Sequence, residues 1–287
     1  MKTILGVDIG GSHITSQLVD VVNKQGLTST WQRNHLDTNA KTDDIIDIWA
    51  STIESSLASS PFKPQYISLA MPGPMDYKNG ISQIKGMNKY DDLYGKDIKE
   101  LLANRLGFEK SNIHFMNDAA SFLQGELFNG SVSEFDNAIG LTLGTGLGTA
   151  HTVKGKAQDS NLWKTPLLKG IAEDYISTKW FVSRFKELSG ITIKDVKDLV
   201  DNHGHSPHFQ TVFKEFSRNL SSFLYFFISK KRPLAVVIGG NIIKTEQHFL
   251  DKTRKYLAEA MGCSIPVRPS LLGEQAMILG AVARFCN

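Results

Sequence analysis

The chain has 287 residues, of which 41% are hydrophobic and 21% charged, and its formal net charge is +3. This length suits two domains of roughly 100–150 residues each or one large α/β domain, and the composition excludes disordered and fibrous proteins. The net charge is small and the sequence has no long run of basic residues, so nucleic acid is not an expected partner. The two cysteines, Cys263 and Cys286, are too few for a disulfide framework or a four-cysteine zinc site.

No apolar stretch reaches about 18 residues, the length of a membrane-spanning helix. The first residues lead directly into an apolar run without a cleavable signal region. We therefore expect a soluble cytoplasmic α/β protein that does not contact a membrane.

The first half of the chain alternates short apolar runs with stretches of helical spacing. One predicted helix starts at Thr42-Asp43-Asp44, which supplies N-cap chemistry, and ends before Pro61. The predicted order is strand 2–9, strand 14–22, strand 27–35, helix 42–57, strand 66–71, helix 97–106, strand 113–116 and helix 119–128.

The second half repeats the theme of strands followed by helices. No linker rich in proline, serine or charge separates the halves, so the boundary between domains is expected near residue 118, inside continuous secondary structure. The predicted order is strand 138–143, strand 149–153, helices 171–188, 193–202 and 209–230, strand 234–238, helix 249–261, strand 265–268 and helix 274–285.

Two glycine-rich turns each lie between two predicted strands, one at Gly10-Gly11-Ser12 and one at Gly144 to Gly148. A dinucleotide-binding fingerprint or a Walker loop requires a helix after the glycines, so both are excluded. The turns are instead typical of β-hairpins in which glycines let backbone N–H groups converge on an anion, although a plain structural turn is the alternative for each. A third glycine pair, Gly239-Gly240, ends a strand and precedes a predicted helix, where a flat nucleobase or ribose would fit against the backbone.

The order and spacing of these segments resemble the sugar kinase, Hsp70 and actin superfamily, and within it the ROK family (repressor, open reading frame, kinase). The matching segments extend over nearly the whole chain: Asp8 to Ser12, Pro72-Gly73-Pro74, Asn117-Asp118-Ala119-Ala120, Gly144 to Gly148, Gly239-Gly240-Asn241, Gly273-Glu274-Gln275-Ala276 and Gly280-Ala281. The resemblance implies an α/β fold of two ribonuclease-H-like (actin-like ATPase) domains around an interdomain cleft. The N-terminal lobe would hold residues 1–118 and 273–287 and the C-terminal lobe residues 119–272, because the last helix returns to the first domain.

The same resemblance implies ATP and Mg²⁺ as ligands and assigns roles to individual residues. Asp118 would be the base that accepts the proton of a sugar hydroxyl, and the alternative is an N-cap aspartate. Asp8 would hold Mg²⁺ through water, and the alternative is a buried turn aspartate. The residues that would cradle the phosphates are Gly10, Gly11, Ser12, Gly144, Thr145 and Gly146, and those that would border adenosine are Gly240 and Asn241. His13 is expected to be a packing or surface residue.

The residues implied to contact the sugar are Gly73, Asn88, Asn117, Asp118 and Glu173. Glu173 is equally well explained as a first-turn glutamate favoured by the helix dipole. Most family members carry a Glu-x-Gly-His segment and a cysteine-rich zinc loop, and this chain has neither cysteine nor histidine between Gly155 and Glu173. Zinc is therefore not expected, two groups that would hold sugar hydroxyls are missing, and the identity of the sugar stays open. Trp163 in this stretch would either stack on a sugar or fill core.

The leading hypothesis is an ATP- and Mg²⁺-dependent kinase that phosphorylates a hydroxyl of a hexose or N-acetylhexosamine. The alternative is a catalytically weak or inactive sugar-sensing protein of the same family without a DNA-binding domain, since the first strand begins at residue 3. An Hsp70- or actin-like ATPase is disfavoured by the length. The oligomeric state stays open, with a homodimer as one option.

Overall fold

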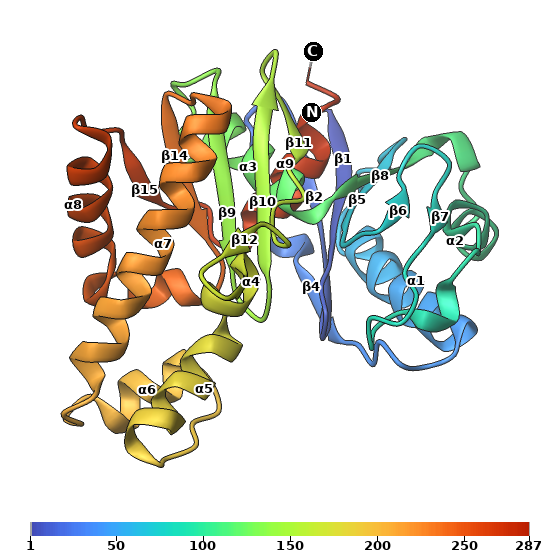
Figure 1. Ribbon diagram of the computed structural model, residues 1–287. Coiled ribbons are helices and arrows are strands. Elements are labelled where there is room, and N and C mark those ends of the chain that lie inside the picture. The colour runs from blue at the N-terminus through green and yellow to red at the C-terminus, as the bar shows by residue number, and fades with distance from the viewer. Residues whose placement is uncertain (1, 287) are drawn as a thin grey trace. The chain divides into compact units, whose positions relative to one another are not determined.

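The computed structural model describes residues 2–286, which form two compact units (Figure 1). The first unit holds the residues up to Gly130 and those from Glu274 onward, and the second unit is Ser131–Gly273. The boundary expected at residue 118 lies too early, because that residue begins helix α3 (Asp118–Asn129). Helix α3 packs against α9 (Gln275–Ala283) and so belongs to the first unit.

The sheet of the first unit has the strand order β3-β2-β1-β5-β8, and β4 also pairs with β2. The β1–β2 pair is antiparallel, whereas β5 runs parallel to β1 and β8 runs parallel to β5. Nearly every residue of β1, β2 and β5 is buried, as expected for a sheet that is covered on both faces. The strands are β1 (Thr3–Ile9), β2 (His13–Asp20), β3 (Gln25–Gly26), β4 (Gln32–His35), β5 (Ile67–Met71) and β8 (Ile113–Asn117).

The strand predicted over residues 27–35 is confirmed only at β4, because a 3-10 turn, η1 (Thr28–Thr30), occupies the start of this range. The buried hydroxyl of Thr30 accepts a hydrogen bond from the Leu18 N–H at 2.9 Å and donates one to the Leu27 carbonyl at 2.7 Å. The Thr30 side chain thus replaces the backbone carbonyl that a neighbouring strand would offer to the Leu18 N–H. This buried amide is therefore hydrogen-bonded although the strand is interrupted.

Helix α1 (Thr42–Ala58) buries the apolar stripe predicted from its spacing, which includes Trp49. Its N-terminus is not capped locally: Lys41 occupies the N-cap position, and the Thr42 N–H donates to the carboxylate of Asp92 at 2.9 Å. The remaining elements of this unit are the hairpin β6 (Met75–Asp76) and β7 (Ile81–Ser82), the 3-10 turns η2 (Asp91–Leu93) and η3 (Lys110–Asn112), and α2 (Ile98–Leu106).

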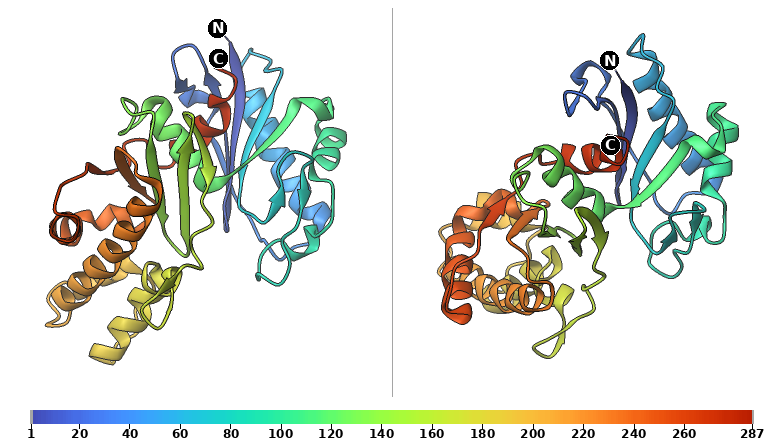
Figure 2. Two further views of the ribbon diagram at one scale, coloured as in Figure 1. Left: turned by 45° about the horizontal axis from the view of Figure 1, so that its top comes forward. Right: turned by 90° about the horizontal axis from the view of Figure 1, so that it is seen from above.

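Helices α3 and α9 lie side by side against the sheet of the first unit (Figures 1 and 2). Glycines make this close approach possible: a Cβ atom at Gly280 would overlap the Ser121 carbonyl oxygen, and one at Gly125 would overlap the carbonyl oxygen of Ala276. The helix predicted at the end of the chain is therefore confirmed, and its packing against the first half follows from two side-chain-free positions.

We expect Gly280→Ala to destabilise the protein by about 3 kcal/mol, because the new methyl group meets backbone atoms that cannot rotate away. Urea unfolding followed by circular dichroism measures the change. Gly204→Ala is the matched control, since Gly204 has right-handed helical backbone angles and its Cβ would lie 3.3 Å from the nearest atom outside the chain neighbours. Equal stability of the two variants would contradict the tight α3–α9 crossing.

The second unit has a sheet of the same design, with the order β11-β10-β9-β14-β15, of which β9, β10 and β11 are antiparallel and β14 and β15 continue in parallel. A small hairpin, β12 with β13, stands apart from it. The strands are β9 (Ala138–Leu143), β10 (Leu147–Val153), β11 (Lys156–Asp159), β12 (Pro166–Leu167), β13 (Gly170–Ile171), β14 (Ala235–Gly239) and β15 (Val267–Pro269).

The helices of the second unit enclose a core rich in phenylalanine, in which the rings of Phe181 and Phe216 lie 4.6 Å apart. The helix predicted over residues 171–188 is two helices, because the chain leaves the helical conformation at Ile176. The helix predicted after Gly240 is a 3-10 segment. The elements are α4 (Ala172–Tyr175), α5 (Thr178–Ser189), α6 (Val196–His203), α7 (Phe209–Lys231), η4 (Ile242–His248) and α8 (Leu250–Met261).

Within residues 2–286, none of these helices combines the length and the apolar character that a membrane crossing demands.

Candidate functional site

The first glycine turn joins β1 to β2 as a hairpin, as predicted. The strands pair from Thr3 with Asp20 to Ile9 with Ile14, and the Gly10 N–H donates to the His13 carbonyl at 2.9 Å. Gly11 and Ser12 are exposed at its tip. Among the described residues, no atom outside the chain neighbours lies within 4 Å of a Cβ placed at Gly11. The folded chain therefore gives no steric reason for glycine there, whereas a ligand that approaches the backbone would give one.

The second glycine turn joins β9 to β10 in the same way, and the Gly144 N–H donates to the Gly146 carbonyl at 3.1 Å. Thr145 at its tip is exposed. Gly144 resembles Gly11, because the described part of the chain places nothing within 4 Å of a Cβ at this position. Each of the two sheets therefore has a hairpin turn in which a glycine backbone has free space beside it, at Gly11 in the first unit and at Gly144 in the second.

Glu173 braces the second hairpin. One of its carboxylate oxygens accepts a hydrogen bond from the Leu147 N–H at 2.9 Å, and a Cβ at Gly146 would lie 2.7 Å from the same oxygen. The start of α5 adds a further contact, since the Thr178 N–H donates to the Gly144 carbonyl at 2.8 Å. Glu173 therefore stabilises the β9–β10 hairpin through its hydrogen bond with Leu147. Its contact with a sugar stays a prediction.

Gly240 lies beside the second hairpin, as the end of β14 is next to the end of β9 in the sheet. Its φ is +88°, and a Cβ there would overlap the backbone carbonyl of Leu143. Glycine is required at this position by the close approach of the two chains. Gly240 and the following Asn241 are exposed, so the two residues predicted to border adenosine are next to the predicted phosphate turn.

Two carboxylates, Asp8 and Asp118, lie at the carboxyl ends of strands in the first unit. Asp8 is near the end of β1 and Asp118 directly follows β8, with β5 between those strands. Burial, and then the negative charge of Asp118, raise the pKa of Asp8 to about 7. One oxygen of Asp8 is buried and has no hydrogen-bond partner among the described residues. The pair is thus a concentration of negative charge that the protein does not fully compensate.

Burial also raises the pKa of Asp118, although the Ala119 N–H, which donates to its carboxylate at 2.8 Å, and the positive charge of Lys89 act in the opposite direction. The alternative role of Asp118 as an N-cap is wrong. Asn117 is the N-cap of α3, and its side-chain oxygen accepts from the Ala120 N–H at 3.0 Å. Asp118 is therefore the first residue of α3 and not its N-cap, and its carboxylate binds the neighbouring Ala119 N–H of that turn.

The predicted sugar contacts in the first unit lie on three different segments. Asn117 donates its amide N–H to the Tyr77 hydroxyl at 3.2 Å, and this hydroxyl donates to the Met71 carbonyl at 3.1 Å. Gly73 is next to the same group, since a Cβ there would lie 2.9 Å from the Tyr77 hydroxyl. Asn88 is exposed in the loop between β7 and η2 and has a left-handed φ of 55°. Their contact with a sugar stays a prediction.

An ion pair beside Asp8 was missed from the sequence. The Arg33 guanidinium on β4 lies 2.6 Å from the Glu274 carboxylate next to α9, and both charges influence the pKa of Asp8. Because Arg33 is already paired with Glu274, its charge is shared between two acidic neighbours. The two residues are 241 positions apart, so no local pattern links them. His13 is half-buried beside His35, with ring centroids 5.6 Å apart, as expected for a packing residue.

The stretch that lacks the zinc-loop residues folds through hydrogen bonds. The Glu173 N–H donates to the Trp163 carbonyl at 3.1 Å, and the Ala172 N–H donates to the Thr165 carbonyl at 2.8 Å. The Trp163 ring packs partly against the core of the second unit, and its Nε1–H donates to Asn161 at 2.8 Å, in agreement with the core-filling alternative. Across residues 2–286, no group of three or more histidine, cysteine, aspartate or glutamate side chains is arranged to hold a metal ion.

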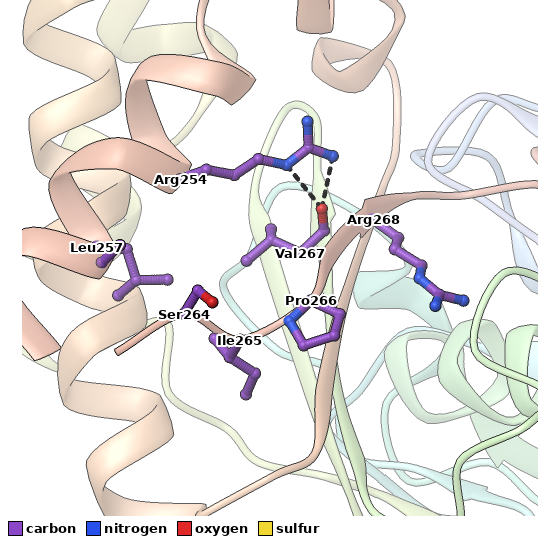
Figure 3. Close-up of a pocket in the computed structure, with 8 residues that line it drawn as sticks. Arg254, Leu257, Ser264, Ile265, Pro266, Val267 and Arg268 are labelled. Carbon is purple, nitrogen blue, oxygen red and sulfur yellow. Dashed lines mark hydrogen bonds between the residues drawn. The ribbon is translucent and has the colours of Figure 1, made fainter. Parts of the chain in front are cut away.

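A surface hollow of about 430 Å³ lies between α8 and β15, away from these residues (Figure 3). The Arg254 guanidinium donates two hydrogen bonds to the Val267 carbonyl, at 3.0 and 2.7 Å, while Arg268 is bound to the Ser131 carbonyl and to Glu134. Both arginines are thus engaged in holding the strand in place, and the hollow contains none of the predicted site residues.

Comparisons with known proteins agree with these motifs. The model of the ROK family matches residues 4–160. A glucokinase of Thermotoga maritima is 24% identical over 320 residues, which cover 98% of this chain and 96% of that protein. An N-acetyl-D-glucosamine kinase of Haemophilus influenzae is 22% identical over 263 residues, covering 76% of this chain and 80% of that protein. A solved ROK family glucokinase from Streptomyces griseus, in complex with glucose and AMPPNP, superposes with a TM-score of 0.79 at 20% identity and covers 97% of each chain, which shows that the fold is the same.

Proposed function

Because the chain belongs to the ROK family, we propose that it is an ATP-dependent carbohydrate kinase that phosphorylates a hydroxyl of a hexose or an N-acetylhexosamine. The observation that carries this proposal is the Asp8–Asp118 pair beside an open glycine turn of the first unit. The similarity to both a glucokinase and an N-acetyl-D-glucosamine kinase supports the acceptor class.

In the proposed reaction, the acceptor hydroxyl oxygen forms a bond to the γ-phosphorus of ATP. The bond from that phosphorus to the oxygen that bridges to the β-phosphate breaks, and ADP leaves with the electron pair. The proton of the hydroxyl passes to the Asp118 carboxylate. Burial supports this role, because a raised pKa makes Asp118 a stronger base than an ordinary aspartate.

The acid pair also fits a divalent cation. One buried oxygen of Asp8 has no hydrogen-bond partner in the described part of the chain, and Arg33 shares its charge with Glu274, so negative charge remains that a cation would balance. Asp8 would hold Mg²⁺ through water, because Mg²⁺ commonly keeps several of its waters and is bound by one or two carboxylates. When bound, Mg²⁺ supplies positive charge that neutralises the phosphate oxygens.

The proposed phosphate contacts are backbone N–H groups of the two hairpins, in the segments Gly10 to Ser12 and Gly144 to Gly146. Such groups bind an anion without a side chain that would crowd it. The exposed Gly240 and Asn241 would border the adenosine. Glycines at Gly11 and Gly144, where the fold itself tolerates a Cβ, support this assignment.

We expect Gly11→Ala to leave the melting temperature within about 2 °C of the wild type, because its backbone is unstrained and the methyl group meets no atom of the described chain. The same methyl group would enter the phosphate cradle, so the affinity for Mg·ATP should fall about tenfold or more. Differential scanning fluorimetry and isothermal titration calorimetry measure the two effects. Gly240→Ala is the contrasting variant, since strain and overlap with Leu143 should lower its melting temperature. Unchanged nucleotide affinity in Gly11→Ala would argue against the cradle.

The direct test of the proposed function is a panel of sugars incubated with purified protein and Mg·ATP. The panel contains glucose, mannose, fructose, glucosamine, N-acetylglucosamine and N-acetylmannosamine. ADP release is followed by a coupled assay, and the product is identified by ³¹P NMR. If a sugar raises the melting temperature while no sugar is phosphorylated, the kinase proposal fails and the sugar-sensing alternative replaces it.

A further inference from the structure

Tyr90 is a buried tyrosine next to the first hairpin. Its side chain is fully buried and contacts the Trp49 ring edge to face, with centroids 5.9 Å apart. Its hydroxyl donates a hydrogen bond to the Gly10 carbonyl oxygen at 2.5 Å. Burial and the nearby charge of Asp8 raise the pKa of Tyr90 above its ordinary value, so the phenol keeps its proton and acts as a donor.

The Gly10 carbonyl belongs to the same peptide group as the Gly11 N–H. In a trans peptide these two groups point in opposite directions, and the single cis bond of the described chain is Gly73–Pro74. Because the carbonyl points to the buried Tyr90, the Gly11 N–H points away from it, at an exposed position. No hydrogen bond within residues 2–286 engages that N–H.

The backbone of Tyr90 is itself held in place. It has a left-handed φ of 57°, its N–H donates to the Thr38 carbonyl at 2.7 Å, and its carbonyl accepts from the Leu93 N–H at 3.0 Å. The phenol therefore reaches Gly10 from a fixed position. Full burial and the contact with Trp49 restrict the movement of the ring, so its hydroxyl can support the turn from a defined place.

We propose that Tyr90 is a positioning residue whose hydroxyl fixes the Gly10–Gly11 peptide, so that the Gly11 N–H faces a phosphate of the bound nucleotide. The inference rests on the proposed function. It adds to that function a residue, Tyr90, that contacts neither the nucleotide nor the sugar. Without the hydroxyl the peptide group is free to rotate, and the N–H loses its fixed direction before the nucleotide arrives.

The test is Tyr90→Phe, which keeps the ring and its packing and removes only the hydroxyl. We expect the KM for ATP and the Kd for Mg·ADP to rise about tenfold, while the KM for the sugar stays within about twofold. Tyr66→Phe is the matched control, because Tyr66 stacks on Phe285 in the same unit, 4.9 Å between centroids, and lies outside the proposed site. It should match the wild type in both constants.

A second measurement addresses the Gly11 N–H directly. In protein labelled with ¹⁵N-glycine, the Gly11 signal, assigned with Gly11→Ala, should shift on addition of Mg·ADP in the wild type and shift less in Tyr90→Phe. A Tyr90→Phe protein that binds Mg·ADP and moves its Gly11 signal like the wild type overturns the inference alone. The inference alone is also overturned if Tyr90→Phe raises the KM for ATP and the KM for the sugar together and lowers the melting temperature, because the hydroxyl then has a general structural role. A wild-type protein that binds no Mg·ADP overturns the proposed function, and the inference with it.

Discussion

Asp118→Asn is expected to lower kcat about 1,000-fold and to leave the KM for ATP and for the sugar within about threefold. Asparagine has nearly the shape of aspartate but does not accept the hydroxyl proton. The α3 helix should stay intact because its cap is Asn117 rather than Asp118. Steady-state kinetics on the sugar that the panel identifies, with calorimetric Kd values for both ligands, measure these quantities.

Asp97→Asn is the matched control for this variant. Asp97 also lies at the start of a helix, α2, where its carboxylate accepts from the Glu100 N–H at 3.0 Å and pairs with Lys110. Its removal should cost some stability and leave kcat unchanged. If Asp118→Asn turns over at a rate close to the wild type, the proton is accepted elsewhere and the assignment of the base is wrong.

Asp8→Asn is expected to lower activity about 100-fold, because the proposed cation site loses its charge, and yet to make the ligand-free protein more stable. Burial and the charge of Asp118 raise the pKa of the Asp8 carboxylate, and one of its oxygens has no hydrogen-bond partner among residues 2–286. A neutral amide removes the cost of keeping this charge in the folded state. At pH 8 we expect a gain of about 2 kcal/mol, or a melting temperature about 4 °C higher.

The size of this stabilisation depends on pH. The folded pKa of Asp8 is about 7, above the ordinary value of 3.8, so the unfolded chain ionises first as the pH rises. The cost of the wild-type carboxylate therefore grows from about pH 4 to pH 7 and is constant above, and the advantage of Asp8→Asn should shrink on going from pH 8 to pH 5. Melting temperatures across this range measure it.

Asp20→Asn should instead lower the stability of the folded protein at pH 8. Burial alone would raise the pKa of Asp20, but hydrogen bonds from Asn23 and the Val22 N–H outweigh it and lower this pKa. Its carboxylate therefore stabilises the fold above the ordinary pKa, and this contribution is lost as the pH falls. A lower melting temperature for Asp8→Asn at pH 8 would show that its carboxylate is compensated in the folded protein.

Features set by neighbouring residues were predictable from the sequence. The strands on both sides of each glycine turn, and the helices that begin at Asp118 and at Phe209, are confirmed because their signals are local. The strand expected over residues 27–35 is confirmed only at residues 32–35, because the buried hydroxyl of Thr30 binds the Leu18 N–H and the chain forms a 3-10 turn there. The boundary at 118 failed because the partner of α3 is α9, near the other end of the chain.

In the candidate site, too, local features were predictable from the sequence and contacts between distant residues were not. The sequence singled out Asp8, Asp118 and the glycine turns, because these residue types in this order suit phosphate chemistry. It could not show that Asn117 rather than Asp118 caps α3, since that depends on which side chain reaches the Ala120 N–H. The Arg33–Glu274 pair and the Tyr90–Gly10 hydrogen bond join distant positions and became visible only in three dimensions.

The return of α9 to the first unit has a consequence for synthesis on the ribosome. Ser131–Gly273 is one uninterrupted stretch, so the second unit has all of its residues before α9 is made. The first unit begins earlier in the sequence but lacks α9, the helix that packs on β1, until the residues after Gly273 have been made. Of the two units, the one whose synthesis starts first is therefore completed second. Until α9 is made, the apolar surfaces of β1 and α3 that it covers stay exposed and can be bound by a chaperone.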